Sequence, residues 1–125
     1  MLKDKSSSAI VAVSDIARSK KFYRDILGLE IIDDSMGQVL VFRTGDTSLV
    51  VYASEEAGTN RANAVVWDVG DEIETITATL KNKGVTFEHY EFDGTRLEGD
   101  IHVSGNMKMV WFKDPDGNIL HLNNM

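Results

Sequence analysis

The sequence predicts an α+β fold in which two tandem βαβββ modules form a cupped mixed sheet. The chain has 125 residues, 42% of them hydrophobic and none of them cysteine, so it can bury one core without disulfides. Short apolar segments and one amphipathic helix occur in the same order in both halves. A shift of 56 residues superposes a strand end, a helix-capping residue and a helix-ending glycine, namely Val13 on Val69, Asp15 on Asp71 and Gly28 on Gly84. Agreement of all three at one offset indicates a duplicated unit.

We expect the first module over residues 8–54, after a flexible arm of residues 1–7 that carries no periodicity. Residues 8–13 are small, apolar or β-branched and predict a strand. Asp15 is the expected N-cap of a helix that Gly28 ends, because glycine readily takes the left-handed conformation at a helix C-terminus. Three apolar stretches separated by turn residues then predict an antiparallel meander, over residues 29–32, 39–42 and 48–52.

The second module is expected over residues 63–125. Residues 64–69 are again short, apolar and rich in valine, which predicts its first strand. Asp71 with Glu74 predicts a capping box at the start of the helix, and Gly84 predicts the helix end. Each module therefore has a sheet with a helix on one face, and the other face must be buried or serve as a site.

The second module also carries an insertion. Its closing hairpin repeats that of the first module at an offset of 72 instead of 56, which leaves about sixteen extra residues (72 minus 56). They lie within residues 88–106, which are rich in glycine and aspartate and predict a mobile loop. His89 and His102 lie in or near this insertion and are expected to be exposed.

Charge and hydropathy exclude several classes of partner. Thirteen basic and twenty acidic residues give a net charge of −7 and a pI near 4.8, the wrong sign for nucleic acid or an anionic membrane. The longest apolar runs are five residues, whereas a membrane-spanning helix needs ~20. No signal-peptide pattern opens the chain, so a cytoplasmic location is expected.

Three motifs resemble the vicinal oxygen chelate superfamily, which includes glyoxalase I, bleomycin resistance proteins and extradiol dioxygenases. They are Val-Ser-Asp-Ile-Ala-Arg-Ser at residues 13–19, Phe-Tyr-Arg-Asp-Ile-Leu-Gly-Leu at 22–29 and Phe-Lys-Asp-Pro-Asp-Gly-Asn at 112–118. Together they span nearly the whole chain. The resemblance implies the glyoxalase/bleomycin resistance-like fold, a small-molecule ligand and a homodimer.

The same resemblance identifies the positions of a metal site. Enzymes of this superfamily typically hold a divalent metal with four side chains, one from the first strand and one from the last strand of each module. Here those positions fall on Ser8, Ala64, His121 and one of Leu49, Val50 and Val51. Since three of the four cannot bind a metal strongly, we predict no metal and no other cofactor. A divalent metal would need a site displaced from these positions.

Strand alternation extends these positions to a set of residues that face the hollow of the sheet. A type I turn with a bulge at Gly117 would pair Trp111 with His121 and Met109 with Asn123. The expected hollow-facing residues are Ile10, Ala12, Val66, Asp68, Met109, Trp111, Ile119, His121 and Asn123. Val110, Phe112, Leu120 and Leu122 would then face the helix. The Asp68 carboxylate would need a partner, or its pKa would rise.

This composition, apolar and polarizable with one carboxylate, one imidazole and one amide, is typical of a binding site. We expect a metal-independent small-molecule-binding protein that sequesters an antibiotic or a toxic metabolite. Trp111, Tyr52, Asp68 and the loop at residues 88–106 are the first candidates for ligand contact, together with Val66, Met109, His121 and Asn123. The alternatives are a lyase, isomerase or dioxygenase with a displaced metal on His121, metal-free acid–base catalysis by His121 with Asp68, and a dimeric interaction module.

Overall fold

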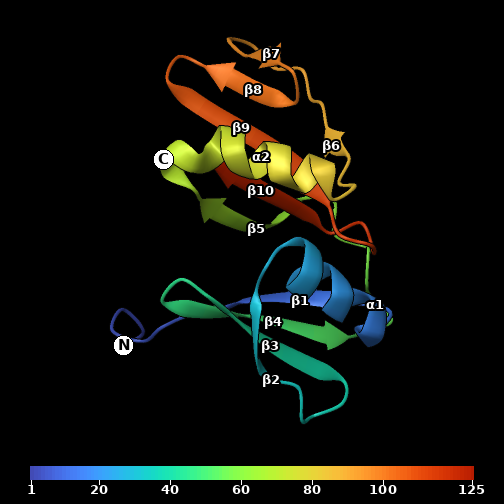
Figure 1. Cartoon of the computed structure of the whole chain (residues 1–125). Helices are drawn as coiled ribbons and strands as arrows, with labels where there is room; N and C mark the ends of the chain where they lie inside the picture. Colours follow the sequence, from blue (N-terminus) through green and yellow to red (C-terminus); the bar gives the residue numbers. More distant parts are fainter. The chain divides into compact units, whose positions relative to one another are not determined.

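The computed structural model describes all residues, Met1–Met125. A βαβββ order in the first half is followed by a second strand and helix with five further strands, two more than the repeat predicts (Figure 1). The chain divides into a first unit, Met1–Thr59, and a second unit, Asn60–Met125. Each unit has its own mixed sheet. The predicted α+β class and the tandem modules are confirmed, with the strands in two sheets. No helix of the chain is long and apolar enough to cross a bilayer.

The first unit contains a four-stranded sheet in the order β1-β4-β3-β2. Its elements are β1 (Ala9–Val13), α1 (Ile16–Lys21), the π-helical turn η1 (Phe22–Ile26), β2 (Glu30–Asp33), β3 (Val39–Thr44) and β4 (Thr47–Ala53). β1 and β4 are parallel, and the other pairs are antiparallel.

The predicted helix ends of the first unit are confirmed. The Asp15 side chain accepts a hydrogen bond from the backbone N–H of Arg18 at 3.0 Å, as an N-cap does. Gly28 has a φ of 76°, in the left-handed region that favours glycine. The helix between them packs on the sheet through Tyr23, which is fully buried and lies 5.8 Å from Phe42, ring centroid to ring centroid.

The second unit contains a sheet in the order β5-β10-β9-β8-β7, and β6 also pairs with β9. Its elements are β5 (Asn63–Asp68), the 3₁₀ turn η2 (Gly70–Glu72), α2 (Ile73–Asn82), β6 (Phe87–Glu88), β7 (Arg96–Glu98), β8 (Ile101–Ser104), β9 (Met107–Lys113) and β10 (Ile119–Asn123). β5 and β10 are parallel, as β1 and β4 are in the first unit.

The expectation of a loop throughout residues 88–106 is wrong, because two strands form there. Strand β9 is long enough to pair with two partners, with Phe87 of β6 opposite Phe112 and with His102 of β8 opposite Met109. β8 then pairs with β7 and extends the sheet by a hairpin. The longest stretch there without a strand is residues 89–95, between β6 and β7, and we name this segment the covering loop.

The predicted capping box of the second helix is also wrong. Neither η2 nor α2 has a side-chain cap. The chain enters α2 through the 3₁₀ turn, in which the Glu72 N–H reaches the Val69 carbonyl at 3.1 Å. Glu74 instead forms an ion pair with Lys108 on β9. The helix end at Gly84 is confirmed, with a φ of 94°.

The closing hairpin has the predicted turn and register. The Gly117 N–H donates to the Asp114 carbonyl at 3.0 Å, and Gly117 has a φ of 92°, as a type I turn with a glycine bulge requires. Trp111 lies opposite His121, and Met109 lies opposite Asn123.

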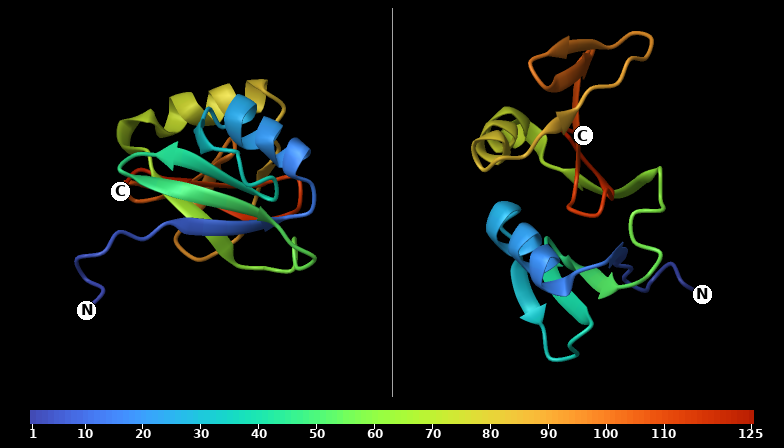
Figure 2. Two further views of the ribbon diagram at one scale, coloured as in Figure 1. Left: turned by 90° about the horizontal axis from the view of Figure 1, so that it is seen from below. Right: turned by 90° about the vertical axis from the view of Figure 1, so that its right-hand side faces the viewer.

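The two faces of the second sheet differ as alternation predicts. α2 lies across one face (Figure 2), and the strand residues buried beneath it are Val110, Phe112, Leu120 and Leu122. We name the opposite side the open face. It carries Met109, Trp111, His121 and Asn123, because these residues alternate with the buried set.

Candidate functional site

Two stacked rings form the centre of the open face. The indole of Trp111 and the imidazole of His121 lie 4.5 Å apart, centroid to centroid, with an angle of 16° between the ring planes. They meet because the turn at Gly117 sets β9 and β10 in the register that places the two residues directly opposite each other. The pair offers a flat, polarizable surface of the kind on which aromatic ligands stack.

The His121 imidazole is fixed in one neutral tautomer. Its Nδ1 donates to the Val110 carbonyl at 3.0 Å, and its Nε2 accepts from the Asn123 side-chain amide at 3.3 Å. The side-chain Oδ1 of Asn123 in turn accepts from the backbone N–H of Met125 at 3.2 Å, which holds the amide in this orientation. Both nitrogens of His121 are therefore engaged within the protein.

Three further aromatic residues complete the cluster, and all of them lie within residues 88–106, which were predicted to contact a ligand as a segment but not by individual residue. His102 of β8 and the covering-loop residues Tyr90 and Phe92 all pack on Trp111, with centroid distances of 4.9, 5.3 and 5.9 Å respectively. Phe92 also lies parallel to His102, with 2° between the planes. Tyr90 and Phe92 remain 37% and 44% exposed, so their outer surfaces are available to a ligand.

His102 is fully buried, contrary to the expectation that it would be exposed. Its Nε2 accepts a hydrogen bond from the backbone N–H of Tyr90 at 2.9 Å. The imidazole proton must then be on Nδ1, which faces the backbone of Met109 without reaching hydrogen-bond geometry. The alternation of His102 with Val103 in β8 is the signal that places its ring on the same face as Met109.

Burial lowers the pKa of both His102 and His121 below the usual value of 6.5, and each ring is also close to a second imidazole, His89 and His102 respectively. The aromatic cluster is therefore uncharged at neutral pH. It can bind by stacking and by hydrogen bonding, but it does not supply a positive charge.

These two histidines predict an acid-sensitive fold. A histidine whose folded pKa is depressed stabilises the protein fully above its unfolded pKa, and that stabilisation is lost as the pH falls through the folded pKa. We expect the free energy of unfolding to be flat above about pH 7 and to fall below 6.5. Urea unfolding at a series of pH values measures this. The His102→Gln/His121→Gln double variant should lose the slope between 6.5 and about 5, above the range in which carboxylates titrate.

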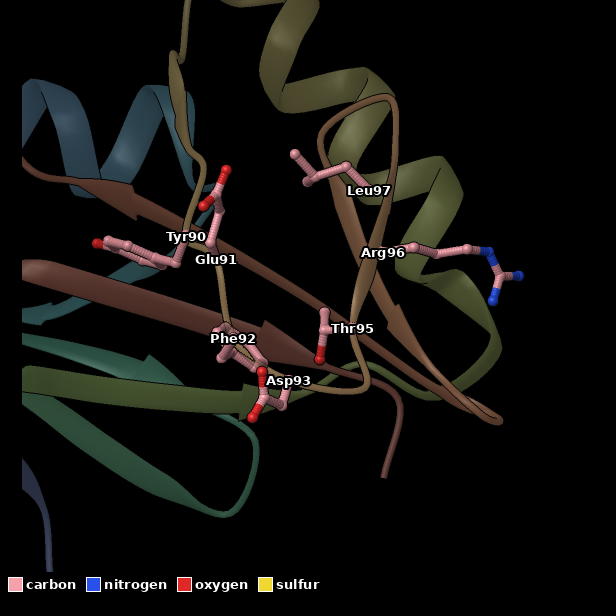
Figure 3. Close-up of a pocket in the computed structure, with 7 residues that line it drawn as sticks. All are labelled: Tyr90, Glu91, Phe92, Asp93, Thr95, Arg96 and Leu97. Atoms are coloured by element: carbon pink, nitrogen blue, oxygen red, sulfur yellow. The ribbon is translucent and has the colours of Figure 1, made fainter.

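A hollow of about 570 Å³ lies within the loop region beside the cluster. Figure 3 shows its two walls, with Tyr90, Glu91, Phe92 and Asp93 of the covering loop on one side and Thr95, Arg96 and Leu97, where the loop enters β7, on the other. The Arg96 guanidinium points away from the hollow and bonds to Glu98 at 3.0 Å. Glu91 and Asp93 form no ion pair, so the hollow has acidic character.

The other predicted site residues lie in several places. Met109 and Asn123 belong to the open face beside Trp111 and His121, and Val66 is 59% exposed on β5, opposite His121. Asp68 is exposed, and its Oδ1 accepts from the backbone N–H of Gly70 at 3.0 Å. No hydrogen bond joins Asp68 to His121, so the structure does not assemble that acid–base pair. Tyr52 lies on β4 of the first unit, opposite Ala12.

The residues present do not fit a family metal site. Ser8 is hydrogen-bonded to Ser48 at 2.7 Å, Ala64 has no donor, and both nitrogens of His121 are engaged. Leu49 and Val51 are fully buried on the helix side, which leaves the half-buried Val50 at the fourth position. No group of three or more His, Cys, Asp or Glu side chains is arranged to hold a metal ion.

Comparison with known proteins adds the family and the fold. A sequence model of the Glyoxalase/Bleomycin resistance protein/Dioxygenase superfamily matches residues 6–122. A search of the curated proteins finds no match. The fosfomycin resistance protein FosX from Listeria monocytogenes superposes with a TM-score of 0.74 and 18% identity, over 96% of this chain and 92% of that one.

Two further solved structures are similar over almost their full length. Lactoylglutathione lyase from Agrobacterium tumefaciens has a TM-score of 0.70 and 19% identity, over 98% of this chain and 95% of that one. A glyoxalase family protein from Enterococcus faecalis has a TM-score of 0.70 and 23% identity, over 98% and 99%. At these identities the likeness shows a shared fold.

Proposed function

Because this chain belongs to the glyoxalase/bleomycin resistance protein/dioxygenase superfamily, we propose that it binds a flat aromatic small molecule with a cationic group, without a metal ion. The observation that carries the proposal is the cluster of Tyr90, Phe92, His102, Trp111 and His121 on the open face. Sequestration of an antibiotic or a toxic metabolite is the role that such binding would serve.

The preference for an aromatic ligand follows from the exposed rings. Tyr90 and Phe92 turn part of their surface to solvent although each is held against Trp111. A planar ligand that stacks on these rings removes apolar surface from water and gains a stacking interaction of about 1–3 kcal/mol per ring.

The preference for a cation follows from charge. Glu91 and Asp93 flank Phe92 and line the hollow without ion-pair partners, and the chain has a net charge of −7. A positively charged group beside aromatic faces and carboxylates is favoured both by the ring quadrupole and by the field of the protein.

Metal independence is part of the proposal. The four positions that would hold the metal in related enzymes do not offer a donor set here, and the engaged nitrogens of His121 leave that ring as a stacking partner. From the family and the sequence pattern we also propose that the chain acts as a homodimer in the cytoplasm.

The test is calorimetric titration of flat aromatic cations, with bleomycin among them and fosfomycin as a non-aromatic anion for comparison. We expect saturable binding of an aromatic cation that EDTA leaves unchanged. Trp111→Ala should weaken this binding at least about tenfold, the equivalent of one lost stacking contact. A Glu91→Gln/Asp93→Asn variant should lower the affinity for aromatic cations more than the affinity for neutral aromatic compounds.

Trp67→Phe is the matched control. Trp67 lies on β5 opposite Leu122, on the helix side of the sheet, so its replacement should leave the affinity unchanged. The same variant makes Trp111 the sole tryptophan and hence the fluorescence reporter of the site. Binding that survives Trp111→Ala, or that EDTA abolishes, would contradict the proposal.

A further inference from the structure

The covering loop, residues 89–95, is attached to the open face through one buried imidazole. The Nε2 atom of His102 accepts the backbone N–H of Tyr90 at 2.9 Å, and the His102 ring is 0% exposed. Tyr90 and Phe92 then lie over the rings of His102 and Trp111. The hydrogen bond therefore lies underneath the aromatic residues that it helps to hold in place.

This bond exists only while His102 is neutral. The imidazole already carries its proton on Nδ1, so Nε2 is the single acceptor of the ring. A second proton would add to Nε2 and place an N–H against the Tyr90 N–H. Two donors then face each other at a ring that is itself buried, and the backbone N–H of Tyr90 loses its partner.

The surrounding charges do not compensate for such a proton. The titratable groups near His102 are His89, Tyr90, Glu91 and Asp93 in the covering loop and His121 on β10, and neither Glu91 nor Asp93 forms a hydrogen bond or ion pair with the His102 ring. The charged side chains of the adjacent strands are paired with one another, Arg96 with Glu98 on β7 and Lys108 of β9 with Glu74. No carboxylate contacts the His102 ring to stabilise an imidazolium.

The other attachment of the loop responds to acid in the opposite sense. His89 Nε2 lies 2.8 Å from Asp100 Oδ1, and Lys81 Nζ lies 2.9 Å from Asp100 Oδ2. Protonation of His89 would turn this contact into an ion pair and strengthen it. Acid release of the loop must therefore come from His102.

We propose that His102 makes the covering loop acid-labile, so that protonation of His102 detaches Tyr90 and Phe92 from the open face while the sheet stays folded. Loop detachment itself is independent of any ligand. Its consequence, weaker ligand binding in acid, rests on the proposed function, because Tyr90 and Phe92 form one wall of that site.

Amide hydrogen exchange of the ligand-free protein at about pH 7.5 and about pH 5 tests the detachment. After correction for the intrinsic pH dependence of exchange, we expect the Tyr90 amide to lose at least about tenfold protection in acid while amides of β9 and β10 keep theirs. His102→Gln supplies a neutral acceptor near the Nε2 position and should keep the amide protected at both pH values. His89→Gln is the matched control and should still lose the protection of the Tyr90 amide in acid, because it keeps His102.

Three results would overturn the proposal: equal Tyr90 protection at both pH values, an acid response that persists in His102→Gln, or simultaneous loss of protection throughout the second unit. A wild-type NMR titration needs no variant. It should show the His102 imidazole resonances and the Tyr90 amide changing with one common midpoint below pH 6.5, and separate midpoints would refute the link.

Ligand titration separates this inference from the proposed function. If no aromatic cation binds at about pH 7.5, the proposed function fails, whereas loop detachment is still decided by hydrogen exchange. If a cation binds with the same affinity at both pH values although the loop detaches, the role of Tyr90 and Phe92 as a wall of the site fails.

Discussion

Replacing Phe112 with alanine is expected to lower the free energy of unfolding by about 3–5 kcal/mol, because it removes a buried aromatic ring and leaves a cavity. Phe112 is 0% exposed and lies 5.6 Å from Phe87 in an edge-to-face arrangement. It pairs with Phe87 on one side and Leu120 on the other, so few atoms can move to fill the space. Urea unfolding followed by tryptophan fluorescence measures the effect, since Trp67 and Trp111 both belong to the second unit.

The adjacent residue provides the control. Trp111 points to the open face and is partly exposed, so Trp111→Ala should cost less stability than Phe112→Ala while it weakens ligand binding. The two neighbouring substitutions thus separate stability from recognition. If Trp111→Ala proved the more destabilising and Phe112→Ala the more damaging to binding, the assignment of the two faces would be reversed.

Local sequence patterns predicted the parts of the fold that depend on neighbours along the chain. Alternation assigned Trp111 and Phe112 to opposite faces, and the turn at Gly117 set the pairing of Trp111 with His121. Both follow from the period of two in a strand and from the backbone geometry that a glycine bulge imposes. The helix ends predicted at Asp15 and Gly28 were also correct, because a helix end is determined by residues within one turn of it.

The aromatic cluster was only half predictable. His102, Tyr90 and Phe92 reach Trp111 through the pairing of β8 with β9 and the docking of the covering loop, which are contacts between segments distant in sequence. Composition marked this region as a loop, since glycine and aspartate favour turns. The composition of residues 88–106 contains no information about the length of β9, which pairs with β6 at one end and with β8 at the other.

The second helix shows a competing interaction. Asp71 and Glu74 have the spacing of a capping box, yet Glu74 forms its ion pair with Lys108 of β9, and the 3₁₀ turn satisfies the Glu72 N–H. The local pattern does not include Lys108, because this residue lies 34 positions further along the chain. A cap predicted from sequence is correct only when no distant partner competes for the same side chain.

The second large effect is expected at the turn that sets the register of the site. Asp114 is 4% exposed, and its Oδ1 accepts the backbone N–H groups of Asp116 and Asn118, each at 2.9 Å. Its Oδ2 accepts from the Asn118 side-chain amide at 2.8 Å. Asp114→Ala removes an ionised acceptor and leaves these donors without it, which should cost about 2–4 kcal/mol of unfolding free energy by the same urea measurement.

The corresponding turn of the first unit provides the matched control. Asp46 follows Gly45 between β3 and β4 and is exposed, so Asp46→Ala should change stability by less than about 0.5 kcal/mol. Asp114→Asn keeps the size of the side chain and one acceptor oxygen, and should fall between the two. If Asp114→Ala were as mild as Asp46→Ala, the hairpin register would depend on the packing of Phe112 and Leu120 beneath α2. In that case the strand register that stacks Trp111 on His121 would determine the turn, and the turn would not determine the register.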